Sequence, residues 1–246
     1  MNTIKELEDL QMEMQKWRRD IHAHPEIAFE EHRTAKIVAE KLESFGLEVE
    51  TGIAGTGVVG TLKKGTGNRS IGLRADLDAL LINEANDFEH KSKNPGKMHA
   101  CGHDGHTVML LGAAKYLAEH GNFDGTVNFI FQPAEENEGG GKAMIDDGLF
   151  DKYAVESVYG MHNIPGMPVA SFAIKPGPIM AAFDAPYTNL LGSPFILEAT
   201  DATLIMLPPF FSNIFGSTAL HIKYIDLIFV LNEKSQSSSS HSSIVP

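Results

Sequence analysis

Short segments rich in β-branched residues alternate with amphipathic helical segments along the first 184 residues, and this alternation most constrains the fold. Strands are predicted at "LEVETGI", "TGVVGTLKKG", "RSIGLRADL", "GTVNFIFQ", "ESVYGMH" and "ASFAIKPG". Helices are predicted at "IKELEDLQMEMQKW" and "EEHRTAKIVAEKLESFG", where apolar residues share one helical face, and at "DGHTVMLLGAAKYLAEHG" and "GKAMIDDGLF". The pattern predicts an α/β domain, a sheet with helices on both faces.

Turn-forming and capping residues suggest where the helices end. The first helix is expected to stop near Pro25, and Gly46 is expected to end the second. For the helix that follows the histidine-rich segment, Asp104 is predicted to be the N-cap and Gly121 the terminator.

Composition excludes several classes of function. The formal net charge of -12 argues against nucleic acid as a partner, because affinity for phosphates comes largely from Lys and Arg. The single cysteine, Cys101, cannot form an internal disulfide, and the N-terminus does not resemble a signal peptide, so a cytoplasmic location is expected. The uncharged stretch "ATLIMLPPFFSNIFGSTALHI" contains two prolines and polar residues, so no membrane span is expected.

Polar groups follow three of the predicted strands: "RADLD", "QPAEE" and "MHN". In sheets of this class, sites gather at the carboxyl ends of the strands. The sequence therefore predicts a functional site at this edge, close to the segment "MHACGHDGH".

This segment holds metal-ligand types at close spacing. Cys101 and His103 lie two residues apart before a helix, and thiolate with imidazole suits zinc and related divalent metals better than Ca²⁺ or Mg²⁺. A lone cysteine is more often a small buried residue, but the nearby histidines favour a ligand here. We expect His106 to orient a neighbour or to pack, and His99 could donate a hydrogen bond to a ligand.

Glu135 and Glu136 are adjacent after a predicted strand, and His162 follows another. A pair of glutamates on a solvated surface would mean little. Beside a metal site, one carboxylate could bind metal while the other takes a proton from water. His162 is either a core histidine or a third protein ligand.

Five motifs in order, "RRDIHAHPEIAFEE", "GLRADLDAL", "MHACGHDGHTVMLLGAA", "IFQPAEE" and "GMHN", resemble the metal-dependent amidohydrolases that include hippurate hydrolase, N-acyl-amino-acid amidohydrolases and auxin-conjugate hydrolases. The resemblance covers about residues 5–184. It implies a zinc-exopeptidase-like catalytic domain with a mixed sheet, into which a smaller lid domain is inserted.

The resemblance also implies the roles of individual residues. Two divalent metal ions are expected, zinc or manganese, with cobalt and nickel also compatible with the ligands. Cys101 would bridge them, and Glu135 would be the general base. Asp76, in "RADLD", would support a metal ligand. The remaining implied ligands are His103, Glu136 and His162.

The family's lid and its last metal-ligand histidine have no counterpart here. Residues 185–246 do not resemble them and end in a serine-rich run, so the expected division is residues 1–184 as the N-terminal part of a catalytic domain and 185–246 as a poorly ordered tail. A shifted reading frame or a truncated gene would explain this. A family-type dimer is not expected, because its surface lies on the absent lid.

Two functions from different classes follow. The first is metal-dependent hydrolysis of the amide bond of small N-acyl or N-aroyl amino acids. The second is an inactive fragment that at most binds metal. A zinc-stabilised structural module fits less well, because such sites have no use for an adjacent carboxylate base such as Glu135.

Overall fold

The computed structural model describes residues 5–136, 138–164 and 173. Its elements, in chain order, are α1 (Lys5–Ala23), α2 (His32–Ser44), β1 (Glu48–Ile53), β2 (Gly57–Lys64), β3 (Ser70–Asp76), α3 (His103–His120), β4 (Gly125–Gln132), α4 (Gly140–Asp146), α5 (Leu149–Lys152) and β5 (Val158–Gly160). The predicted tail and, apart from Ala173, the strand predicted at "ASFAIKPG" lie outside the described residues. Among the described residues, no helix is both long and apolar enough to cross a membrane.

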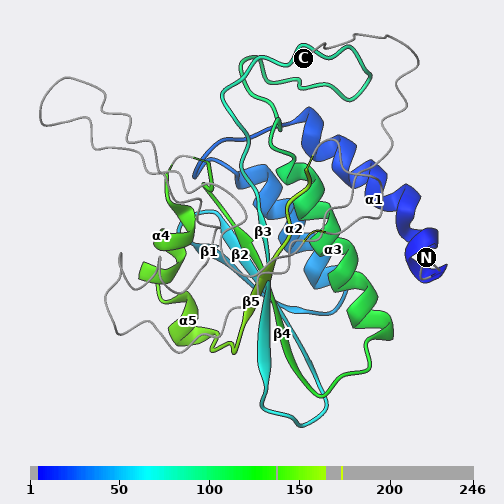
Figure 1. Ribbon diagram of the computed structural model, residues 1–246, viewed down its shortest axis with the longest axis vertical. Coiled ribbons are helices and arrows are strands. Elements are labelled where there is room, and N and C mark those ends of the chain that lie inside the picture. The colour runs from blue at the N-terminus through cyan, green and yellow to red at the C-terminus, as the bar shows by residue number, and fades with distance from the viewer. Residues whose placement is uncertain (1–4, 137, 165–172, 174–246) are drawn as a thin grey trace, which may run out of the picture.

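Within this part of the chain, five strands form one mixed sheet in the order β1-β2-β4-β3-β5 (Figure 1). β2 pairs antiparallel with both β1 and β4, whereas β3 pairs parallel with β4 and β5. The mixed α/β sheet confirms the predicted fold class. β4, "GTVNFIFQ", is buried along nearly its whole length, as expected of an interior strand covered on both faces.

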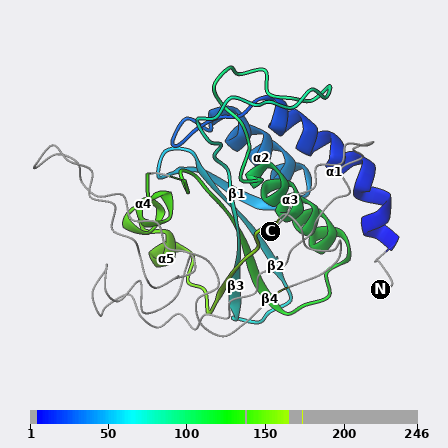
Figure 2. The ribbon, with the colours of Figure 1, turned by 45° about the horizontal axis from the view of Figure 1, so that its top comes forward.

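Helices cover both faces of the sheet (Figure 2). Because successive side chains of a strand point to opposite faces, Phe129 and Phe131 of β4 face one way and Ile130 the other. The phenylalanines belong to a core completed by α1, α2 and α3, which contribute Trp17, Ile21, Val38, Leu42, Val108 and Leu111 among others. Ile130 belongs to a smaller core that includes Met144 of α4 and Leu149 of α5.

The start of α3 differs from the prediction. The N-cap is Gly102, with a left-handed φ of 96°, and Asp104 lies within the first turn of the helix instead of capping it. Its buried carboxylate accepts hydrogen bonds from His22 at 2.9 Å and Arg18 at 3.3 Å, both on α1. Asp104 was therefore assigned the wrong local role, because a contact with another helix holds its side chain.

Two further boundaries differ. The segment "GKAMIDDGLF" forms two short helices, α4 and α5, separated at Gly148, whose φ of 87° is left-handed and interrupts the helix. The strand predicted at "ESVYGMH" is confined to the three residues of β5. The predicted ends of α1 and α2 are confirmed within a few residues.

Three parallel strands end at the same edge of the sheet. In the register, Asp76 of β3 lies beside Gln132 of β4, and Arg74 lies beside Gly160 of β5. The first turn of α3 packs onto this edge, where the Thr107 hydroxyl donates to the Asp76 carbonyl at 2.8 Å. The residues that follow the three strands are thereby brought to the N-terminus of α3.

Candidate metal centre

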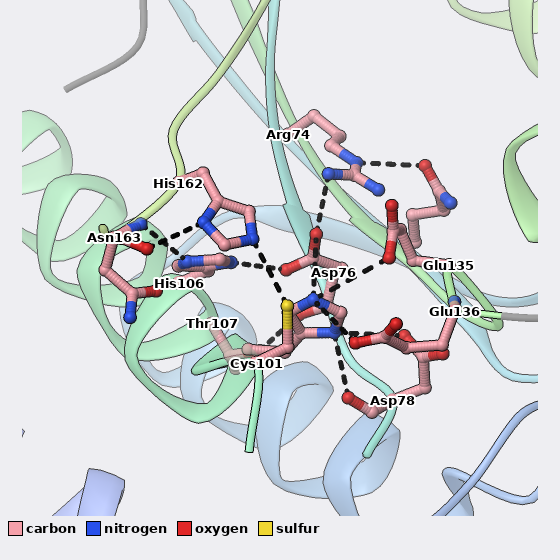
Figure 3. Close-up of polar contacts among 12 residues, drawn as sticks. Arg74, Asp76, Asp78, Cys101, His106, Thr107, Glu135, Glu136, His162 and Asn163 are labelled. Carbon is pink, nitrogen blue, oxygen red and sulfur yellow. Dashed lines mark hydrogen bonds and ion pairs between the residues drawn. The ribbon is translucent and has the colours of Figure 1, made fainter. Parts of the chain in front are cut away.

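The polar groups predicted at the strand ends meet at the N-terminus of α3 (Figure 3). Figure 3 shows the Cys101 sulfur directed toward the ring of His162, with Glu135 and Glu136 on the other side of Asp76. His103 is fully buried, and ion-pair distances of 3.6 and 3.8 Å join its Nε2 atom to Glu136 and Glu135. Three strand ends and one helix N-terminus thus contribute to a single cluster.

The hydrogen bonds of His103 determine which ring nitrogen is free. Nδ1 lies 2.9 Å from the backbone carbonyl oxygen of Asp78 and 3.2 Å from its Oδ1. Because a carbonyl oxygen can only accept, Nδ1 carries a proton, and Nε2 is the nitrogen that can offer a lone pair to a metal once it has lost its own proton. Nε2 is buried without a hydrogen-bond partner among the described residues, which makes it available as a metal ligand.

In His162 too, a backbone carbonyl oxygen binds Nδ1 and leaves Nε2 facing the cluster. Its Nδ1 donates to the Asn163 carbonyl oxygen at 2.7 Å, so that Nε2 keeps its lone pair, 3.3 Å from the Cys101 sulfur. Burial, reinforced by the neighbouring His106, lowers the pKa of His162 to about 4, so its ring is neutral near pH 7. Burial raises the pKa of the Cys101 thiol, an effect that His103 opposes.

His106 is a close neighbour whose two nitrogens are both in use. The Asn163 amide donates to Nε2 at 3.0 Å, so Nδ1 carries the proton and donates to Asp76 Oδ1 at 2.6 Å. The other oxygen of Asp76 accepts from Arg74 at 2.7 Å. His106 therefore orients the segment that carries His162, as its predicted supporting role implies.

The two glutamates lie in different surroundings. The backbone amide of Glu136 donates to Asp78 Oδ2 at 2.9 Å, and Glu136 Oε1 is buried without a hydrogen-bond partner among the described residues. The pKa of Glu135 is raised, mainly by burial, with Arg74 opposing the shift and Asp76 reinforcing it. A carboxylate of raised pKa is a better proton acceptor near neutral pH than an exposed one.

The side chains fit a metal ion. Two groups bring ligand atoms within 4.8 Å of one another: Cys101, His103 and His162, and His103 with Glu135 and Glu136. A third group of Asp76, His103 and His106 is equally close, but the two hydrogen bonds of His106 leave it no free nitrogen.

Electrostatics favour positive charge at the point where the two groups meet. Burial lowers the pKa of His103, yet the carboxylates of Asp76 and Asp78 raise it well above the ordinary value for histidine. The orphaned His103 Nε2 and Glu136 Oε1 atoms are the kind of buried groups that a bound cation would satisfy. Sulfur, nitrogen and oxygen donors together suit a transition metal.

The cluster contains every predicted site residue, although the part each plays remains a prediction. Asp76 hydrogen-bonds to His106 and Arg74 and lies 3.6 Å from His103 Nε2, while the hydrogen-bond partner of His103 is Asp78, which the sequence reasoning missed. Its signal was present in "RADLD", where the second aspartate also follows the strand. His99, considered as a donor to a ligand, is buried and makes no hydrogen bond from its ring among the described residues.

Comparison with known proteins places these residues in a family. The model of peptidase family M20/M25/M40 matches residues 72–241. This range extends past residue 184, beyond which we predicted no family resemblance, so the predicted domain boundary stays a prediction. Hippurate hydrolase of Campylobacter jejuni is 53% identical over 192 residues, which cover 78% of this chain and 50% of that protein.

Two further relatives agree. N-acyl-L-amino acid amidohydrolase of Geobacillus stearothermophilus is 44% identical over 178 residues, 72% of this chain and 48% of that protein. A crystal structure described as a dinuclear metal-binding peptidase of the M20 family from Bacillus subtilis superimposes with a TM-score of 0.67 at 39% identity, covering 71% of this chain and 48% of that one. The chain spans about half the length of the curated relatives it matches.

Proposed function

The chain belongs to peptidase family M20/M25/M40, and we propose from this premise that it carries the metal centre of an amidohydrolase acting on N-acyl or N-aroyl amino acids. The observation that carries the proposal is the arrangement around His103, whose free, buried Nε2 lies between the thiol side and the glutamate side of the cluster. Relatives named as hippurate hydrolase and N-acyl-L-amino acid amidohydrolase support the substrate class.

We propose that the centre holds two divalent metal ions, of which zinc and manganese suit the donors best. The proposed ligands are Cys101, His103, Glu136 and His162, whose sulfur, nitrogen and oxygen atoms would hold the ions. When bound, the metals would polarise the substrate carbonyl and make water more acidic. The Bacillus subtilis relative, described as binding a dinuclear metal, supports the number of ions.

Glu135 is the proposed general base. Its carboxylate lies beside the proposed ligands, 3.8 Å from His103 Nε2. The hydrogen bond from the neighbouring backbone to Asp78 is made by the amide of Glu136. In hydrolysis it would take a proton from water at its carboxylate oxygen while the oxygen of that water attacks the amide carbonyl. The same carboxyl group would then give the proton to the amine nitrogen as the amide bond breaks.

Asp76 and His106 have positioning roles in this proposal. Their hydrogen bonds link the end of β3 to the amide of Asn163, next to His162. Arg74 neutralises part of the negative charge of Asp76, with which it forms a buried ion pair. The location we propose is cytoplasmic, since a lone cysteine held as a thiolate ligand suits a reducing compartment.

The test replaces Glu135 with glutamine. Loss of the base is expected to lower the rate of amine release from hippurate and N-acetyl amino acids by about a hundredfold or more. Metal content, measured by elemental analysis, is expected to stay at the wild-type level. Equal activity in Glu135→Gln would exclude Glu135 as the base, whereas a wild-type chain that binds metal and releases no amine would support the alternative of an inactive metal-binding chain.

A further inference from the structure

A buried glutamate, distant in sequence, contacts the segment that presents the two site glutamates. Glu31 is fully buried, and its Oε1 atom accepts a hydrogen bond from the backbone amide of Ala134 at 2.8 Å. Its other oxygen accepts from the Thr56 hydroxyl at 2.5 Å. The Glu31 carboxylate therefore binds the backbone of the residue that precedes Glu135.

The Glu31 side chain is not needed to cap its own helix. Glu31 is the N-cap residue of α2 but makes no side-chain capping hydrogen bond. Glu26 performs that task, because its carboxylate accepts from the backbone amides of Arg33 and Thr34. The Glu31 carboxylate can therefore turn into the protein, toward the end of β4.

Ala134 has a backbone conformation that requires such support. Its φ of 51° is left-handed, a region that a residue with a Cβ atom adopts only at an energetic cost. Strained residues of this kind persist where the surroundings hold them and are frequent at functional sites. Here the Ala134 amide donates to Glu31, and its carbonyl oxygen accepts from the Gly140 amide at 2.9 Å.

We propose that Glu31 is a positioning residue that holds Ala134 in its left-handed conformation and so directs the side chains of Glu135 and Glu136 into the site. The proposal rests on the roles proposed above for these glutamates. Two buried carboxylates thus restrain one short turn from opposite ends, Glu31 at the Ala134 amide and Asp78 at the Glu136 amide. Removal of Glu31 would leave a buried amide without an acceptor and let the turn relax.

The experiment compares three variants of the full chain. Glu31→Ala removes the acceptor, and the double variant Glu31→Ala/Ala134→Gly also removes the Cβ atom that makes the left-handed conformation unfavourable. Thr56→Val is the matched control. It removes the other hydrogen-bond partner of Glu31 and leaves the hydrogen bond from the Ala134 amide to Glu31 in place. Zinc affinity is measured by competition with a chelating dye, and exchange of the Ala134 amide hydrogen by NMR or mass spectrometry.

Glu31→Ala is expected to weaken zinc binding by about tenfold or more and to accelerate exchange at Ala134. The double variant is expected to recover most of the affinity, whereas Thr56→Val keeps both wild-type affinity and slow exchange. The proposal is overturned if Glu31→Ala keeps wild-type zinc affinity, if Thr56→Val loses as much affinity as Glu31→Ala, or if the double variant does not recover affinity. Neither measurement requires amide hydrolysis, so an inactive chain would count against the proposed function alone.

Discussion

Asp78 joins the two sides of the proposed metal centre, and its replacement gives the sharpest test of how that centre is held. One oxygen accepts from His103 Nδ1 at 3.2 Å and the other from the Glu136 amide at 2.9 Å. Asp78→Ala removes both acceptors, while Asp78→Asn keeps one oxygen and therefore one of the two bonds. His103 would retain its bond to the backbone carbonyl of residue 78 in either variant.

The expected loss of zinc affinity follows from the number of hydrogen bonds that each variant loses. Partners that orient metal ligands typically contribute a factor of about 10 to 100 in metal affinity. Asp78→Asn, which keeps one bond, is expected near the lower limit, about 1.4 kcal/mol, and Asp78→Ala near the upper limit, about 2.8 kcal/mol. The assay is zinc competition with a chelating dye, supported by circular dichroism to verify that each variant is folded.

Asp87→Asn is the matched control. This aspartate is exposed and, among the described residues, forms its ion pair with Lys91 and not with a residue of the cluster, so its loss is expected to leave zinc affinity unchanged. Wild-type affinity in a folded Asp78→Ala variant would refute the reasoning, because it would show that His103 and Glu136 reach the metal without the carboxylate that links them.

Two further predictions concern stability. Phe129→Ala, in the fully buried centre of β4, is expected to lower the free energy of unfolding by about 3–5 kcal/mol, measured by urea denaturation, whereas a loss below about 1 kcal/mol would contradict the core described here. Burial opposes protonation of His22, yet hydrogen bonds and charge from Asp104 and Glu84 raise its pKa above 6.5. The stability that charged His22 contributes is therefore complete below pH 6.5 and is lost as the pH rises through the folded-state pKa. In the metal-free protein, the difference in free energy of unfolding between wild type and His22→Gln should therefore shrink from about pH 6.5 upward. A difference that stays constant with pH would exclude the ion pairs of His22 as its source.

Local patterns were sufficient to predict most elements of the fold. The three- and four-residue spacing of apolar side chains predicted α1 and α2, because a helix that packs on a sheet must bury one continuous stripe. The boundaries were less predictable. The role of Asp104 was wrong because its carboxylate is held by His22 of α1, a contact between segments that are far apart in the sequence.

The same distinction applies to the site. "RADLD", "HACGH", "QPAEE" and "MHN" could be grouped from the sequence, because parallel strands bring their carboxyl ends to one edge. The division of tasks between Asp76 and Asp78 could not be predicted, since the two lie only two residues apart at the end of the same strand. It depends on where β3 ends and how the first turn of α3 packs against it.

The sequence by itself determined which chemical groups are present and, through its periodicity, at which ends of which elements they lie. The tertiary structure alone decided how those groups are oriented. It assigned the protons of His103 and His106 through their hydrogen-bond partners, and it brought Glu31 to Ala134 across 103 positions of the chain. The physical reason is that hydrogen bonds depend on distance and direction in space, which helical and strand periodicity specifies only within one element.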